Sequence, residues 1–143
     1  MTVLNLGCGE RTEGDVRLDI RKTKAVNIIA DAHLLPFRDN VFDKIICTEV
    51  LEHLISPFNA LREARRILKR RGILIITVPN LTELRRILSI ARHPLRVRRL
   101  DVDHKQGWDA IELHRLMHQV GLKVLEVKWL DLYGRKNRKE PLS

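Results

Sequence analysis

Aromatic residues are scarce in this chain of 143 residues, because three Phe, two Trp and one Tyr make up only 4% of it. Binding of single-stranded nucleic acid mainly by stacking depends on aromatic side chains, so we do not expect that mode to dominate. Long apolar runs are also missing, and no stretch approaches the roughly 20 residues that cross a bilayer. The N-terminus shows no basic-then-apolar secretory pattern, and we expect a cytoplasmic protein without a transmembrane segment.

Cysteine is rare as well, with Cys8 and Cys47 as its two instances. In a chain without a secretory signal, two cysteines are expected to be reduced thiols. Internal repeats and linkers are absent, and the composition of 44% hydrophobic and 31% charged residues is that of a soluble globular protein. We therefore expect one domain over residues 1–135, followed by a basic, flexible tail over 136–143.

Acidic residues are fewer than basic ones: the chain has 18 Asp and Glu but 27 Lys and Arg, which gives a net charge of +9. Such an excess favours a polyanionic partner such as nucleic acid. The alternative is a charge-rich surface of the kind found in thermophilic proteins. A candidate nucleic-acid surface is the set of arginines Arg85, Arg86, Arg92, Arg96, Arg98 and Arg99, and a solvated basic helix and loop is its equal alternative.

The stretch Val-Leu-Asn-Leu-Gly-Cys-Gly over residues 3–9 organises the chain. Its apolar start predicts a buried strand, and its two glycines allow the backbone to turn sharply and to approach a ligand closely. A strand that leads into a Gly-X-Gly turn is typical of nucleotide sites, although a plain tight turn has the same appearance.

Acidic and polar residues follow the next predicted strands. Strand 16–18 ends at Asp19, strand 27–30 at Asp31 and Ala32, and strand 42–47 at Thr48 and Glu49. Because ligands bind beyond the carboxyl ends of parallel strands, we expect these residues to share one rim with the glycine turn. The carboxylate of Asp19 suits the two hydroxyls of a ribose, with capping of a turn as the alternative. Leu34–Phe37 forms an apolar turn that suits a flat ring.

The second half of the chain alternates helix and strand patterns. Ser56 and Pro57 predict the start of a helix over 58–68 that Gly72 ends. A buried strand over 73–78 and a helix over 82–91 follow. Asp109 with Glu112 resembles a capping box and opens a helix to 120, and alternation over 125–129 predicts a last strand. The fold class is therefore α/β: a Rossmann-like, doubly wound, mostly parallel sheet with helices on both faces.

The order of these segments resembles the class I S-adenosylmethionine-dependent methyltransferases, in the branch called methyltransferase type 11. The resemblance extends over about residues 3–130. It is carried by the segments Leu4–Gly9, Leu18-Asp19, Ala30–His33 with Leu35–Phe37, Phe42-Asp43, Glu49–Leu54 and Gly72–Asn80, with Asp109–Leu122 similar to the helix before the last strands.

The resemblance implies S-adenosylmethionine as the cofactor and S-adenosylhomocysteine as its product. Asp19 would then accept from the ribose, Asp31 from the adenine amine, and Thr48 and Glu49 would border the methionine amino group. The full set of implied cofactor-binding residues is Leu6, Gly7, Cys8, Gly9, Asp19, Asp31, Ala32, His33, Thr48 and Glu49.

The chain departs from the family pattern in four respects. Asn5 stands where many relatives have Asp, and we expect the first helix to be shortened or missing. We also expect no helix before the first strand and an incomplete closing β-hairpin. We therefore expect an open site, or one completed by a second copy of the chain or by a partner subunit.

The expected chemistry is transfer of a methyl group to an acceptor that the sequence does not identify. His53 is the candidate catalytic base, with a backbone-bonded histidine at a helix start as the alternative. His104, His114 and His118 lack the spacing of a metal site, and no metal is expected. A nicotinamide-dependent oxidoreductase would need glycine where Thr12 stands. A cofactor-binding scaffold or activating subunit without catalysis is the remaining alternative.

Overall fold

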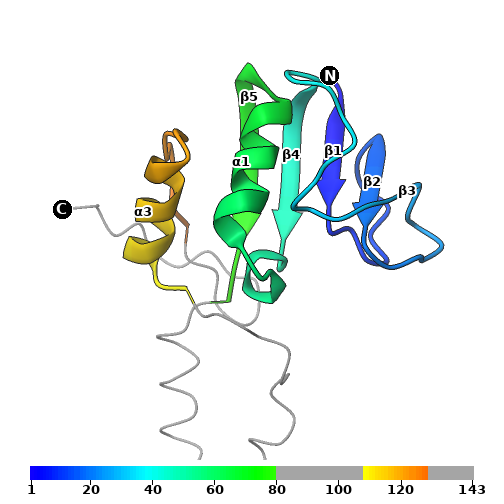
Figure 1. Cartoon of the computed structure of the whole chain (residues 1–143), viewed down its shortest axis with the longest axis horizontal. Helices are drawn as coiled ribbons and strands as arrows, with labels where there is room; N and C mark the ends of the chain where they lie inside the picture. The colour runs from blue at the N-terminus through cyan, green and yellow to red at the C-terminus, as the bar shows by residue number, and fades with distance from the viewer. Residues whose placement is uncertain (80–107, 129–143) are drawn as a thin grey trace, which may run out of the picture.

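The computed structural model describes residues 1–79 and 108–128. Its centre is a five-stranded parallel sheet with the strand order β3-β2-β1-β4-β5 (Figure 1). The strands are β1 (Val3–Leu6), β2 (Val16–Asp19), β3 (Ile28–Ile29), β4 (Phe42–Thr48) and β5 (Leu68–Thr77). The order reverses beside β1, which has β2 on one side and β4 on the other. This topology confirms the predicted Rossmann-like α/β fold.

Alternating strand residues build the hydrophobic core on one face of the sheet. Leu4 pairs with Ile45 and Leu6 pairs with Cys47 across β1 and β4, and all four side chains are at most 2% exposed. Because successive residues of a strand point to opposite faces, this register places Asn5 and Ile46 on the other face, which we call the second face.

Helix α1 (Pro57–Ile67) covers the core face. The Ser56 hydroxyl accepts from the backbone N–H of Asn59 at 3.4 Å, and Pro57 opens the helix, which confirms the predicted start. Helix α3 (Ala110–Gln119) begins at Asp109, whose carboxylate accepts from the backbone N–H of Glu112 at 2.7 Å, as the capping box predicts. The helix residues that belong to the buried core cluster are Ala60, Leu61, Ala64, Ile67 and Met117.

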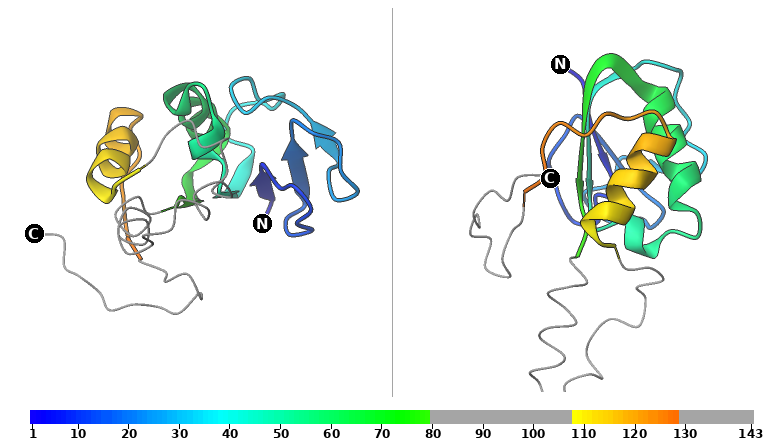
Figure 2. Two further views of the ribbon diagram at one scale, coloured as in Figure 1. Left: turned by 90° about the horizontal axis from the view of Figure 1, so that it is seen from below. Right: turned by 90° about the vertical axis from the view of Figure 1, so that its left-hand side faces the viewer.

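Both described helices lie on the same side of the sheet (Figure 2). Right-handed crossovers explain this arrangement, because β4 to β5 and β1 to β2 step in opposite directions and their connections must lie on opposite faces. The connections assigned to the second face are residues 7–15 and 20–27, and neither contains a helix. The shortened first helix that the sequence predicts is therefore confirmed.

Two polar strand residues fasten these connections to the second face. Asn5, which is fully buried, donates through its amide to Glu13 O at 3.3 Å. Arg17 donates to Ala25 O at 2.6 Å and to Gly14 O at 3.1 Å. On β4 and β5 the same face carries isoleucines, and Ile73 and Ile75 are 54% and 40% exposed.

The boundaries differ from the sequence prediction at two places. Helix α1 ends at Ile67, and Gly72 lies inside β5. A Cβ on Gly72 would stand 2.7 Å from Leu68 Cδ1. The glycine therefore allows close packing against Leu68 and does not end the helix. Residues 122–128 form no strand, so the predicted last strand is wrong over these residues. Trp129, the helix over 82–91, the arginines of 85–99 and the tail lie outside the described residues.

Within residues 1–79 and 108–128, no helix has both the length and the apolar character that a bilayer crossing demands.

Candidate functional site at the carboxyl ends of the strands

A pocket of about 340 Å³ opens where β1, β2 and β4 end. This is the edge at which the strand order reverses, and ligands of doubly wound sheets bind at that edge. Of the residues predicted to bind a cofactor, six line this pocket: Gly7, Cys8, Gly9, Asp19, Thr48 and Glu49. Leu6 is buried beneath it in the core, and Asp31, Ala32 and His33 are not among its lining residues.

The glycine turn forms the floor of the pocket. The backbone N–H groups of Gly7 and Cys8 donate to Leu18 O at 2.8 and 3.0 Å, which ties the turn to β2. Gly7 and Gly9 have φ values of +71° and +55°, a conformation that side chains with a Cβ rarely adopt. Apart from its two chain neighbours, no described residue has a heavy atom within 4 Å of where a Cβ on Gly9 would stand, so a ligand can approach the backbone there.

Asp19 lies at the side of the pocket, at the end of β2, and is 7% exposed. One carboxylate oxygen accepts from the backbone N–H of Gly9 at 2.9 Å, and the other accepts from the backbone N–H of Arg21 at 2.9 Å. A carboxylate has about four acceptor positions, so each oxygen retains one for a ligand donor. The arrangement suits a pair of hydroxyl groups.

The end of β4 forms the opposite side of the pocket. Glu49 has a φ of +57°, and its backbone N–H donates to Thr77 O at 3.0 Å. Arg11 reaches across from the loop after β1, and its guanidinium donates to Thr48 O at 3.1 Å. Arg11, Glu10 and Arg21 line the pocket, although the sequence reasoning did not single them out. For Glu10 and Arg11, the signal was the absence of apolar periodicity directly after Gly9.

Asp31 and His33 form a separate polar group after β3. Asp31 Oδ1 accepts from the backbone N–H of His33 at 2.8 Å and lies 2.6 Å from His33 Nδ1. The backbone N–H of Ser56 donates to His33 Nε2 at 3.2 Å, so Nε2 carries no proton and Nδ1 is the donor to Asp31. The two bonds from His33 hold the pKa of Asp31 below its usual value, and the backbone bond contributes most to this shift.

The loop after β3 is clamped onto α1 by one arginine. Arg66 donates to the backbone oxygens of Leu35 and Phe37 at 3.0 and 2.7 Å, and it binds Glu63 through two nitrogens at 2.8 Å each. Leu35 is 3% exposed and belongs to the core, and Phe37 packs edge-on against Phe42. Leu35 and Phe37 therefore pack toward the core, whereas Leu34 is 78% exposed, and the covering of a flat ring by this turn stays a prediction.

The two thiols are buried. Burial raises the pKa of Cys8, and the negative charge of Asp19 adds to this shift. Burial together with the charge of Glu52 raises the pKa of Cys47 to about 12. Both thiols are therefore protonated at neutral pH and unsuited to nucleophilic attack.

His53, the predicted base, does not line the pocket. It lies in the short 3₁₀ turn η1 (Leu51–His53), its side chain is 41% exposed, and its Nε2 is 4.0 Å from a carboxylate oxygen of Glu52. Its catalytic role stays a prediction. In the described parts of the chain, no three His, Cys, Asp or Glu side chains gather closely enough to hold a metal ion.

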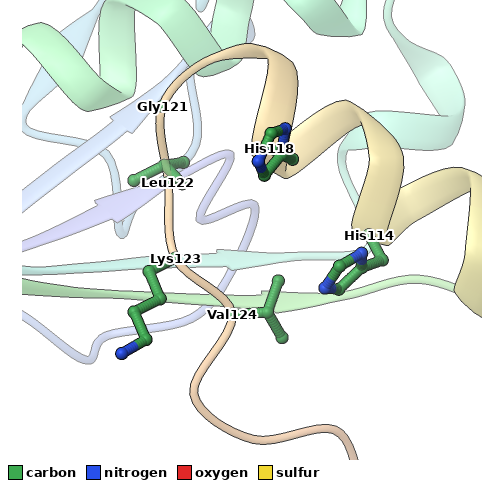
Figure 3. A pocket seen from close by; sticks show the side chains of 6 residues that line it. All are labelled: His114, His118, Gly121, Leu122, Lys123 and Val124. Atoms are coloured by element: carbon green, nitrogen blue, oxygen red, sulfur yellow. The ribbon is translucent and has the colours of Figure 1, made fainter. Parts of the chain in front are cut away.

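A larger hollow of about 500 Å³ lies beside the C-terminal end of α3 (Figure 3). His114 and His118 project from the helix toward it, whereas the ammonium group of Lys123 points away from both rings. This hollow contains none of the residues predicted to bind a cofactor. We place the functional site at the strand ends, because the buried acid and the glycine turn meet there.

Residues 14–76 match the family model described as "Methyltransferase domain". An uncharacterized protein of Methanocaldococcus jannaschii, MJ0638, is 35% identical to the chain over 120 aligned residues. That alignment covers 71% of this chain and 53% of the relative, so the chain spans about half the relative's length.

Solved structures share the fold. A SAM-dependent methyltransferase from Archaeoglobus fulgidus has a TM-score of 0.71 at 20% identity, covering 90% of this chain and 64% of that one. A Haloferax volcanii methyltransferase, described as putative and solved in complex with the Trm112 methyltransferase activator, has a TM-score of 0.65 at 22% identity. It covers 92% of this chain and 66% of that one. At these identities the likeness concerns the fold.

Proposed function

We propose that the chain is a class I S-adenosylmethionine-dependent methyltransferase, which binds this cofactor in the pocket at the strand ends and transfers a methyl group to an acceptor; the match of residues 14–76 to the methyltransferase-domain family model supports this. The observation that carries the proposal is the meeting of the open Gly9 backbone, the buried Asp19 carboxylate and the end of β4 around one pocket. A volume of about 340 Å³ is within the range of small-molecule sites.

The pocket residues fit the chemical groups of the cofactor. Asp19 would accept from the two ribose hydroxyls through its remaining acceptor positions. Gly7 and Gly9 would lie along the ribose and the methionine chain, where Gly9 has no Cβ to obstruct it. Asp31 has no described partner on its second oxygen and would accept from the adenine amine. Ala32 and His33 would border the ring, and Thr48 and Glu49 the methionine amino group.

The chain's own residues contribute mainly alignment. Bound S-adenosylmethionine supplies an electrophilic methyl group on a sulfonium, and transfer requires an acceptor atom in line with the breaking bond. Rigid placement of both reactants is worth several kcal/mol in such reactions. In this chain, the hydrogen bonds from Gly7 and Cys8 to β2 and from Gly9 to Asp19 keep the turn rigid. A weak nucleophile also needs a base, for which His53 is the candidate.

Calorimetry with S-adenosylmethionine and S-adenosylhomocysteine tests the cofactor site. We expect binding by the purified protein and a loss of about tenfold or more in Asp19→Asn, because one charged acceptor is replaced by a neutral amide. Asp39→Asn is the matched control, because Asp39 is an exposed acid outside the pocket. Equal affinity in the wild type and in Asp19→Asn would place the cofactor elsewhere.

A labelled-methyl screen over RNA, protein and metabolite pools then separates two functions. Turnover on any acceptor supports a methyltransferase, whereas binding without turnover supports the scaffold or activating subunit. A partner subunit is part of this proposal, and its support is the Haloferax volcanii neighbour, which was solved with an activator. If a second subunit completes the pocket, the cofactor affinity should increase when the partner is added. In a homodimer, the affinity should increase with protein concentration.

A further inference from the structure

We propose that Arg11 is the residue that recognises the carboxylate at the amino-acid end of the cofactor. This inference rests on the proposed function, because it concerns the same pocket. The Arg11 guanidinium lies in the pocket, donates to a neutral carbonyl oxygen and is paired with no described acid.

The position of Arg11 is fixed from both ends. Its backbone N–H donates to Cys8 O at 2.9 Å, which makes it the last residue of the turn that begins at Cys8. Its side chain reaches the end of β4, where Nη1 donates to Thr48 O at 3.1 Å. It therefore spans the pocket from the glycine turn to β4, on the β4 side of Asp19.

The acids around the pocket would oppose binding of a ligand carboxylate, so a positive charge that is not offset by an acid is needed there. Three acids line it, namely Glu10, Asp19 and Glu49, and they would repel a carboxylate. Arg21 lies beside Asp19, with Nε 3.8 Å from its Oδ1, so its charge is offset. The Arg11 guanidinium has five N–H donors, and the single described acceptor for them is Thr48 O. The remaining donors provide the fork geometry that binds a carboxylate through two parallel bonds.

Three ligands separate this role from a structural one. S-adenosylhomocysteine carries both the carboxylate and the amino group, its decarboxylated analogue retains the amino group alone, and 5′-methylthioadenosine has neither. We expect the wild type to prefer S-adenosylhomocysteine to the decarboxylated analogue. Arg11→Met should weaken the binding of S-adenosylhomocysteine by about tenfold to a hundredfold, which is the contribution of a charged hydrogen-bond pair. The affinities for the other two ligands should stay unchanged. Arg11→Lys should recover part of the preference.

Arg21→Met is the matched control, because it removes the other arginine of the same pocket and should not change the preference among the three ligands. If Arg11→Met weakens all three ligands equally, the arginine merely holds the loop against β4, and the inference is overturned. The same holds if the wild type does not distinguish the analogues with and without the carboxylate. If the wild type binds none of the three, the proposed cofactor site itself fails, and the inference fails with it.

Discussion

The side chain of Val50 occupies the space that a Cβ on Gly7 would need, with Cγ2 closer to that position than any real carbon contact. Gly7 also has a φ of +71°. Gly7→Ala should therefore destabilise the protein by about 2–4 kcal/mol, through left-handed backbone strain and overpacking. Urea unfolding measures the loss.

Val50→Ala identifies the part of that loss which comes from overlap. In a double-mutant cycle we expect Gly7→Ala with Val50→Ala to be less destabilised than the sum of the single variants. Gly9→Ala is the comparison, because it has a positive φ but open space around its Cβ. Strict additivity between positions 7 and 50 would contradict the overlap.

From the hydrogen bonds between Arg66 and Glu63, we predict that the stability of the protein depends on pH. The bonds from Arg66, and to a lesser extent the Leu35 N–H, hold the pKa of Glu63 below its ordinary value, against the opposing effect of burial. A carboxyl with a lowered folded pKa contributes stability above its unfolded pKa and loses it as the pH falls through the folded pKa. Glu63→Gln should therefore lower the free energy of unfolding at neutral pH and flatten its decline below about pH 4.5.

Arg66→Lys tests the clamp itself. A lysine keeps the charge but not the planar fork, so we expect a loss of about 1.5–3 kcal/mol at neutral pH. Arg62→Lys, on an exposed part of the same helix, should change stability little. Equal effects at positions 62 and 66 would mean that the clamp does not contribute.

His33 should show a single tautomer. Because Nε2 accepts from the Ser56 N–H, nitrogen spectra of labelled histidine should show the proton on Nδ1 at neutral pH. His33→Asn can keep the donor to Asp31, and His33→Gln can keep the acceptor for Ser56. Each should be more stable than His33→Ala. A proton on Nε2 in the native protein would rule out the described pair of bonds.

The two cysteines should resist modification. Cys8 and Cys47 are 1% and 2% exposed, and the pKa of each is raised. A thiol reagent at about pH 8 should therefore react with them only when the protein opens, and both should react in denaturant. Cys8→Ser and Cys47→Ser assign any signal. Immediate reaction of Cys8 under native conditions would show that the glycine turn exposes a thiolate.

Much of the site could be predicted because it depends on local patterns. Gly7, Asp19 and Thr48 each end an apolar strand, and parallel strands bring their carboxyl ends to one edge. Arg11 was not found, because its role depends on Thr48, which is 37 residues away. Helical periodicity places Arg66 outside the apolar stripe. Two of its five acceptor contacts are to Glu63 on the same helix, but the other three are to Leu35, Phe37 and Asp39, in a loop whose path the periodicity does not predict.

Boundaries were less predictable for a similar reason. Gly72 is a frequent helix terminator, yet here packing against Leu68 places it in a strand. The alternation of Leu125 and Val127 is typical of a strand, but a strand also needs a partner edge, and the described residues 122–128 are not paired in the sheet. The local sequence does not show whether such a partner edge is present.

The short connections of the second face also have a kinetic consequence. Contacts between β1 and β2 close a span of 12 residues, from Val3 to Asp15, whereas those between the starts of β1 and β4 span 41, from Thr2 to Asp43. Loop closure costs about 0.6 kcal/mol more for each doubling of length, so the shorter span is favoured by about 1 kcal/mol before any packing is counted. We expect the β1–β2 unit to form first during folding, and Leu18→Ala to slow folding more than Ile45→Val for an equal loss of stability. Because the described connections 7–15 and 20–27 contain no helix, the β1–β2 unit would thereby form a local nucleus on which the distant strands assemble.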